Sequence, residues 1–230
     1  MNTNICGHPN PTLEFIRKSV KYFRGLGFNV AIGPEIETEW YNFDFLRVTA
    51  DHPSRDTQDT FWTKENKVLR TQTSSVQGRV THDWGFKPPL RVISPGRVYR
   101  NEATDSSHEA VFHQIEGFVI DKDINMGNLI YVIEDFIRYT FGSVKTKFYP
   151  HNFPYVEPGM EVVIEWNGKW LEVLGCGMIH PEVLKNMSID IDVYRGFAFG
   201  LGADRFAMLK NNIEDIRLLY HPDYRMITQL

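Results

Sequence analysis

The sequence has little cysteine, with only Cys6 and Cys176 among its 230 residues. Two cysteines cannot form the set of disulfides that stabilises small secreted domains. Apolar runs long enough to span a membrane are also missing, and the N-terminus lacks the basic and apolar segments of a signal peptide. We therefore predict a chain that works in a reducing cytoplasm and does not enter a membrane.

An excess of basic residues is missing as well. The chain has 25 Lys and Arg against 29 Asp and Glu, a formal net charge of −4. Proteins that bind nucleic acids electrostatically are positively charged. If this chain acts on a nucleic acid, most of the contacts to the phosphates must therefore come from a partner. A hydrophobic content of 42% and a charged content of 23% are ordinary for a globular protein. The length suits one large domain, which we place at residues 1–230.

Local patterns predict a mixture of helices and strands. Asn10-Pro11 is a strong helix start, and the apolar residues that follow it at helical spacing are Leu13, Ile16, Val20, Phe23 and Leu26. A second amphipathic helix is predicted over 126–141 and strands over 28–32, 145–149, 160–166, 169–174 and 196–202, with a hairpin turn at Asn167-Gly168. The order of these elements favours an α+β fold, an antiparallel sheet flanked by helices, over alternating βαβ units.

Residues 91–102 and 110–120 alternate apolar and polar residues around the polar segment 103–109, and we interpret them as a hairpin. This hairpin would place Arg100 and Glu102 opposite Gln114 and Glu116. Burial of these polar groups is costly unless they bind one another or a ligand. The pattern therefore predicts either an exposed ladder of ion pairs or a site for a polar ligand that carries both signs of charge.

Other patterns look like ligand motifs but do not fit them. His108 and His113 are five residues apart in a loop-to-strand context, so one helical face cannot present both to zinc. Gly200-Leu201-Gly202 lacks the third glycine of a dinucleotide-binding loop. Arg205, in contrast, follows directly at a predicted helix start, where backbone N–H groups favour an anion. Cys176 has no neighbouring base in the sequence and is expected to be a packed thiol.

Six segments, in order, resemble the class II aminoacyl-tRNA synthetases, and most closely the α chains of the bacterial phenylalanine branch. Three resemble the motifs of the class: 33–37 resembles motif 1 (near 28–45), 96–102 with 112–117 resembles motif 2 (near 91–120), and 200–205 resembles motif 3 (near 196–210). Three more, at 69–74, 153–158 and 170–175, are typical of the phenylalanine branch. The resemblance begins near His8 and implies the catalytic-core fold of the class.

This resemblance implies that the chain activates L-phenylalanine with ATP and Mg²⁺ and transfers it to tRNA(Phe). Arg100 and Arg205 would be the catalytic residues, on the α- and γ-phosphates of ATP. The other residues implied for ATP are Glu102, Ser107, His108, Phe112 and Glu172, and those implied for the metal are Glu157 and Glu172. The attacking carboxylate is already ionised, so positioning and charge carry the reaction without a general base.

The resemblance also implies a site for the amino acid. The residues implied for its ammonium and carboxylate are Gln72, Ser74, Gln77, Gln114 and Glu116, and those around its ring are Phe153, Tyr155, Val156, Ala198 and Phe199. An apolar pocket rejects an added hydroxyl by only about 10²-fold. Tyrosine would therefore be removed elsewhere, and in the family that editing belongs to the β subunit.

The sequence departs from the family in three places. Tyr155 replaces the usual phenylalanine, and its hydroxyl would either change side-chain selectivity or bind a backbone carbonyl. Ala203-Asp204 replaces an apolar residue and glutamate, and the usual N-terminal helical arm does not precede the match. We expect a hetero-oligomer with a β subunit, and the aromatic-rich segment 35–45, with Trp40 and Phe43, is the candidate interface.

Two alternatives remain open. One is an enzyme that adenylates an aromatic amino acid for an acceptor other than tRNA. The other is a ligand-sensing module without catalysis, against which the presence of both motif arginines argues.

Overall fold

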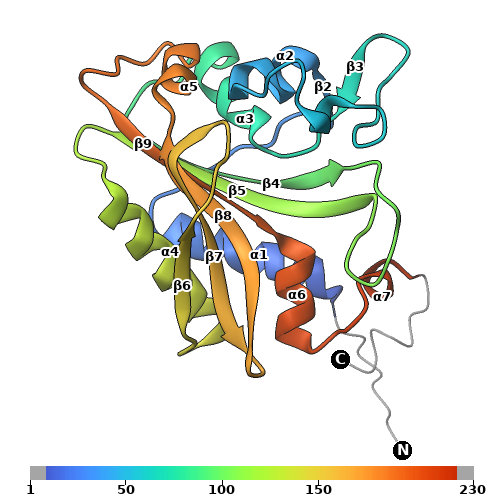
Figure 1. Cartoon of the computed structure of the whole chain (residues 1–230). Coiled ribbons are helices and arrows are strands. Elements are labelled where there is room, and N and C mark those ends of the chain that lie inside the picture. The colour runs from blue at the N-terminus through green and yellow to red at the C-terminus, as the bar shows by residue number, and fades with distance from the viewer. Residues whose placement is uncertain (1–8, 222–230) are drawn as a thin grey trace, which may run out of the picture.

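The computed structural model describes residues 9–221 (Figure 1). Cys6, His8 and both ends of the predicted domain lie outside the described residues. A seven-stranded sheet in the order β1-β4-β5-β9-β8-β7-β6 forms the centre, and only the β1–β4 pair is parallel. The strands are β1 Asn29–Val30, β4 Leu90–Tyr99, β5 Val111–Asp121, β6 Thr146–Pro150, β7 Val156–Trp166, β8 Lys169–Ile179 and β9 Arg195–Gly202. The predicted α+β fold is confirmed.

Helices cover both faces of this sheet (Figure 1). The helices are α1 Pro11–Gly25, α2 Glu39–Asn42, α3 Ser75–Gly78, α4 Met126–Phe141, α5 Pro181–Asn186, α6 Ala203–Asn211 and α7 Arg217–Tyr220. Helices α1, α4 and α6 pack on one face, while α2, α3 and α5 lie on the other with a small sheet of β2 Ile36–Thr38 and β3 Lys67–Leu69. Alternation along β5 divides its side chains between the two cores: Ile115 and Val119 enter the first, and Phe118 and Ile120 enter the second.

The predicted start of α1 is confirmed, because the Asn10 side chain accepts the N–H groups of Thr12 and Leu13. The predicted apolar stripe is confirmed in part: Phe23 is buried and Ile16 and Leu26 pack against the same core, but Leu13 is 58% exposed. The fully buried residues of the helix include Thr12, Phe15, Ser19 and Phe23, so its buried face is rotated from the predicted stripe. Aromatic rings set this rotation, because Phe15 and Phe23 both pack against the ring of α4 residue Phe136.

The register of the β4–β5 hairpin also differs from the prediction. The ladder ends at Tyr99 opposite Val111, and Glu116 lies opposite Ser94. Arg100 and Glu102 therefore follow the end of β4 instead of pairing with Gln114 and Glu116. The loop between the strands covers residues 100–110 instead of the predicted 103–109, so Arg100 and Glu102 both lie in it, beyond the end of the ladder.

The β7–β8 hairpin turns at the predicted site, where Asn167 and Gly168 both have positive φ (50° and 76°). Among residues 9–221, no helix combines the length and the apolar composition needed to cross a membrane.

Candidate active site

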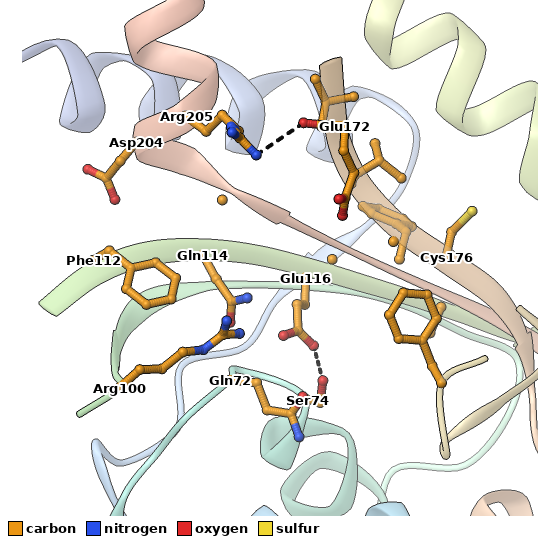
Figure 2. Close-up of a pocket in the computed structure, with 18 of the residues that line it drawn as sticks. Gln72, Ser74, Arg100, Phe112, Gln114, Glu116, Glu172, Cys176, Asp204 and Arg205 are labelled. Atoms are coloured by element: carbon orange, nitrogen blue, oxygen red, sulfur yellow. Dashed lines mark hydrogen bonds between the residues drawn. The ribbon is translucent and has the colours of Figure 1, made fainter. Parts of the chain in front are cut away.

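A cavity of about 470 Å³ opens on the α2–α3–α5 side of the sheet (Figure 2). Strands β5, β8 and β9 form its floor, and the loops after β3, β4 and β6 form its walls. It gathers almost every residue that the sequence singled out: Gln72, Ser74, Gln77, Arg100, Glu102, Ser107, His108, Phe112, Gln114, Glu116, Phe153, Tyr155, Val156, Glu172, Ala198, Phe199 and Arg205.

Glu157 is the exception, and the structure does not bring it into the cavity. Its side chain is 74% exposed, and an oxygen of its carboxylate lies 3.2 Å from Nε2 of His180. Strand alternation explains this, because the preceding residue, Val156, is the one that faces the cavity. Of the two carboxylates predicted for a metal, only Glu172 therefore lines the site. Residues 9–221 hold no cluster of three or more acidic, histidine or cysteine side chains placed to bind a metal ion.

One end of the cavity is built from guanidinium groups. The Arg100 guanidinium lies 5.2 Å from the centre of the Phe112 ring, and Arg205 projects from the first turn of α6 beside Glu172 (Figure 2). The hydrogen bonds of both arginines are long: 3.5 Å from Arg100 to the carbonyl of Thr71 and 3.4 Å from Arg205 to the carbonyl of Glu172. Neither arginine forms an ion pair within the described part of the chain, so both remain available to an anion.

The middle of the cavity is polar and acidic. Glu116 is buried and accepts hydrogen bonds from the backbone N–H of Thr73, at 3.2 Å, and from the hydroxyl of Ser74. Burial raises the pKa of the Glu116 carboxyl to about 7, although these hydrogen bonds and the nearby Arg70 and Arg100 oppose the rise. The buried Oε1 atom of Gln114 has no hydrogen-bond partner among residues 9–221. Two adjacent acceptors thus face a space that suits a cationic donor.

The far end of the cavity is apolar. The rings of Phe153 and Tyr155 stack with centroids 5.9 Å apart, and Val156 and Ala198 complete this wall. Glycine keeps the space open at Gly175, where an added Cβ would lie 2.8 Å from the Phe153 ring. Burial, reinforced by the charge of Glu116, raises the pKa of the Tyr155 hydroxyl.

Of two further side chains near this end, Phe199 contributes differently from its predicted role, and Cys176 is the packed thiol that the sequence predicted. Phe199 borders the cavity, but its ring stacks on Phe23 in the opposite core, with centroids 5.3 Å apart. Cys176 is buried and lines the cavity, and burial raises the pKa of its thiol to about 12. A neutral, packed thiol is the expected state at neutral pH.

Sequence reasoning missed one residue that supports the site. Arg70 is 2% exposed, and its guanidinium donates to the backbone carbonyls of Arg97, at 2.8 Å, and Gly33, at 3.1 Å. It therefore ties the motif 1 segment to the motif 2 strand. An arginine after a short strand gives no local indication of such burial, because its partners lie 27 and 37 residues away.

Comparisons with known proteins agree with this arrangement. The family model for the tRNA synthetases class II core domain (F) matches residues 2–230. The phenylalanine–tRNA ligase α subunits of Clostridium perfringens and Caldanaerobacter subterraneus subsp. tengcongensis are 47% and 49% identical to the chain, over 97% of the chain and 69% of each relative. A solved pyrrolysyl tRNA synthetase, PylSc of Desulfitobacterium hafniense, matches with a TM-score of 0.69 at 18% identity, over 90% of this chain and 71% of that one. This last likeness shows the fold.

Proposed function

Because this chain belongs to the class II tRNA synthetase core family, with the α subunits of phenylalanine–tRNA ligases, we propose that its cavity activates L-phenylalanine with ATP and passes the phenylalanyl group to tRNA(Phe). The observation that carries the proposal is the arrangement of apolar, acidic and basic side chains along one cavity. An apolar end adjoins a buried carboxylate, Arg100 lies near that carboxylate, and Arg205 lines the same cavity; within residues 9–221 neither arginine forms an ion pair.

At the polar end, the triphosphate of ATP lies between Arg100 and Arg205, and its adenine stacks on Phe112. Glu102 accepts a hydrogen bond from the adenine amino group, and Ser107 and His108 approach the phosphates from the loop. The carboxylate oxygen of phenylalanine attacks the α-phosphorus, the bond from that phosphorus to the bridging oxygen breaks, and pyrophosphate leaves without any proton transfer. Fixed guanidinium groups stabilise the charge that grows on the phosphate oxygens.

The ammonium group of the amino acid binds at Glu116 and Gln114, since these adjacent acceptors face the middle of the cavity and the Glu116 carboxylate forms no ion pair among residues 9–221. Its ring enters the space bounded by Phe153, Tyr155 and Ala198. Gln72, Ser74 and Gln77 line the opposite wall, where they orient the carboxylate toward the α-phosphate. Positioning of this kind supplies much of the rate in a reaction between two bound substrates.

The site also fits Mg²⁺. This ion uses one or two carboxylates together with the phosphates of its substrate, and Glu172 lies where it can supply that carboxylate, next to Arg205. When bound, Mg²⁺ supplies positive charge that neutralises the phosphates. Glu157 is left out of this proposal because it points away from the cavity.

In the second step, a terminal hydroxyl of tRNA attacks the carbonyl carbon of the adenylate, the bond from that carbon to the phosphate oxygen breaks, and AMP leaves while the hydroxyl proton passes to a phosphate oxygen. The net charge of −4 supports a need for a partner that holds the tRNA, and the relatives are named as α subunits.

We propose that a β subunit binds along the β1 edge, where Ile32 and Ile36 are 70% and 51% exposed. Trp40 is also exposed. Phe43, in contrast, is 1% exposed and belongs to the core of this chain, so the prediction that Phe43 lies in the interface is wrong. The bacterial origin of the relatives supports a cytoplasmic location for this chain.

Phenylalanine-dependent exchange of pyrophosphate into ATP tests this function directly, first with the chain alone and then with a bacterial β subunit added. Exchange in either case supports the activation step, and exchange only with the β subunit supports a dependent α chain. Charging of tRNA(Phe) by the complex then distinguishes tRNA from another acceptor. Absence of exchange with phenylalanine, tyrosine and tryptophan in both cases would reject an adenylating enzyme in favour of a binding module.

A further inference from the structure

A second cavity, of about 240 Å³, lies on the opposite face of the sheet from the active site. It is enclosed by α1, the end of α4 and the end of α6. None of its lining residues belongs to the active-site cavity. Cavities that hold drug-sized ligands begin near 300 Å³, so this one suits a smaller molecule.

A buried hydroxyl without a partner faces this cavity. Ser19, on α1, is 1% exposed and lines the cavity, and its Oγ atom has no hydrogen-bond partner in the described part of the chain. A buried polar atom that lacks a partner is costly and uncommon. Its position therefore indicates a ligand with polar atoms, which would supply the missing hydrogen bond.

Positive charge gathers at the same cavity. Lys210 donates to the carbonyl of Thr140 at 3.2 Å, and Lys18 pairs with Glu14 at 3.0 Å, so each ammonium group keeps two further N–H donors. Glu14 does not neutralise both lysines, because both of its carboxylate oxygens also accept from Arg17. Burial and the charge of Lys18 lower the pKa of Lys210, as expected where two cations approach each other without a shared anion.

We propose that this cavity binds a small anion, a phosphate or carboxylate group held by Lys18, Lys210 and Ser19. The apolar part of its wall, with Phe15 and the ring of Tyr139, accepts a short hydrophobic body on that anion. The site lies at the C-terminal end of α6, whose first turn carries Arg205. Lys210 follows Arg205 by five residues, a rise of roughly 7.5 Å along the helix, and the two cavities share no lining residue, so the anion is distinct from ATP.

Nuclear magnetic resonance of the whole chain tests the proposal, with inorganic phosphate and benzoate as the two probes. Each is titrated against sodium chloride at equal ionic strength to separate binding from screening. We expect saturable shifts of the backbone amides of Ser19 and Lys210 with at least one probe, and the stronger probe identifies the headgroup. Because phosphate also has affinity for the active site, the titration is repeated in Arg205→Ala, where these shifts should persist.

Three variants decide whether the cavity is responsible. Lys210→Gln should weaken binding at this site by about tenfold or more, the ratio expected for a lost charge-assisted hydrogen bond. Ser19→Ala should weaken it several-fold while thermal stability is kept, since the variant removes an unpaired buried hydroxyl. Lys21→Gln is the matched control, because Lys21 lies exposed on the same helix and outside the cavity. Equal affinity in all three variants, or no shift at Ser19 and Lys210 in the unmodified chain, would overturn the proposal.

Discussion

Asp204 accepts the backbone N–H of His113 through Oδ2 at 2.6 Å, and this bond joins the first turn of α6 to strand β5. The same carboxylate accepts the hydroxyls of Thr12 and Tyr220 through Oδ1, each at 2.8 Å. The side chain is 1% exposed, so four segments of the chain meet at one buried anion. Arg205 follows it directly in sequence, and its direction therefore depends on this junction.

Asp204→Asn should impair both stability and activation. The amide loses the charge that strengthens the three hydrogen bonds, each worth roughly 1.5–3 kcal/mol. A loss of about 2 kcal/mol in the free energy of unfolding would lower Tm by roughly 4–8 °C in a chain of this size. Displacement of Arg205 should raise the KM for ATP more than the KM for phenylalanine, as measured by pyrophosphate exchange. Asp204→Glu, which keeps the negative charge, is the control and should keep the KM for ATP closer to that of the parent chain. If both variants keep the parent KM and Tm, Asp204 does not position Arg205.

Phenylalanine binding should weaken as the pH falls below about 7. The Glu116 carboxyl has its pKa raised to about 7 by burial, so it carries a full negative charge only above that pH and loses its attraction for the ammonium group below it. The KM for phenylalanine should therefore rise up to tenfold for each pH unit below the pKa, while the KM for ATP changes little. In Glu116→Gln the KM should be high and flat between pH 6 and about 8, and a parent profile that is equally flat would contradict this role.

The same pKa has a consequence for stability. The folded chain binds a proton at Glu116 more tightly than the unfolded chain does, because the ordinary pKa of a glutamate carboxyl is only 4.5. The unliganded chain should therefore lose stability as the pH rises from about 4.5 through about 7. Glu116→Gln should remove this component of the pH dependence of Tm.

Local sequence signals predicted the features that depend on neighbouring residues. The cap at Asn10, the bounds of α4 and the turn at Asn167-Gly168 all follow from such signals, and the motif residues identified the cavity. Features set by distant partners could not be predicted in this way. The rotation of α1 depends on rings in other helices, and the place of Arg100 beyond the ladder depends on how ten residues of β4 pair with β5.

Gly96→Ala tests how tightly Arg70 joins motifs 1 and 2. A Cβ at position 96 would lie 2.1 Å from Nη2 of Arg70, a distance that forces the guanidinium out of its place. Because Arg70 is buried and its bonds to Arg97 and Gly33 would be strained, we expect a loss of about 2–4 kcal/mol in the free energy of unfolding. Gly25→Ala is the control, since nothing lies within 4 Å of a Cβ there and the change should be neutral or slightly stabilising. Denaturant unfolding of both variants measures the difference, and equal values would show that Arg70 is not constrained by this contact.

Tyr155→Phe should relax the selection of phenylalanine over tyrosine. The hydroxyl of Tyr155 lies at the cavity wall in the field of Glu116 and Arg100, so its removal leaves room and polar surroundings for a hydroxyl on the substrate. We expect the ratio of kcat/KM for phenylalanine to that for tyrosine to fall several-fold, within the roughly 10²-fold limit on rejection of an added hydroxyl. Pyrophosphate exchange with each amino acid provides both constants. Phe153→Tyr is the matched comparison, because it adds a hydroxyl to the stacked ring on the same wall and should lower activation of both amino acids. A ratio unchanged in Tyr155→Phe would mean that the hydroxyl has no part in selectivity and that the apolar wall alone sets it.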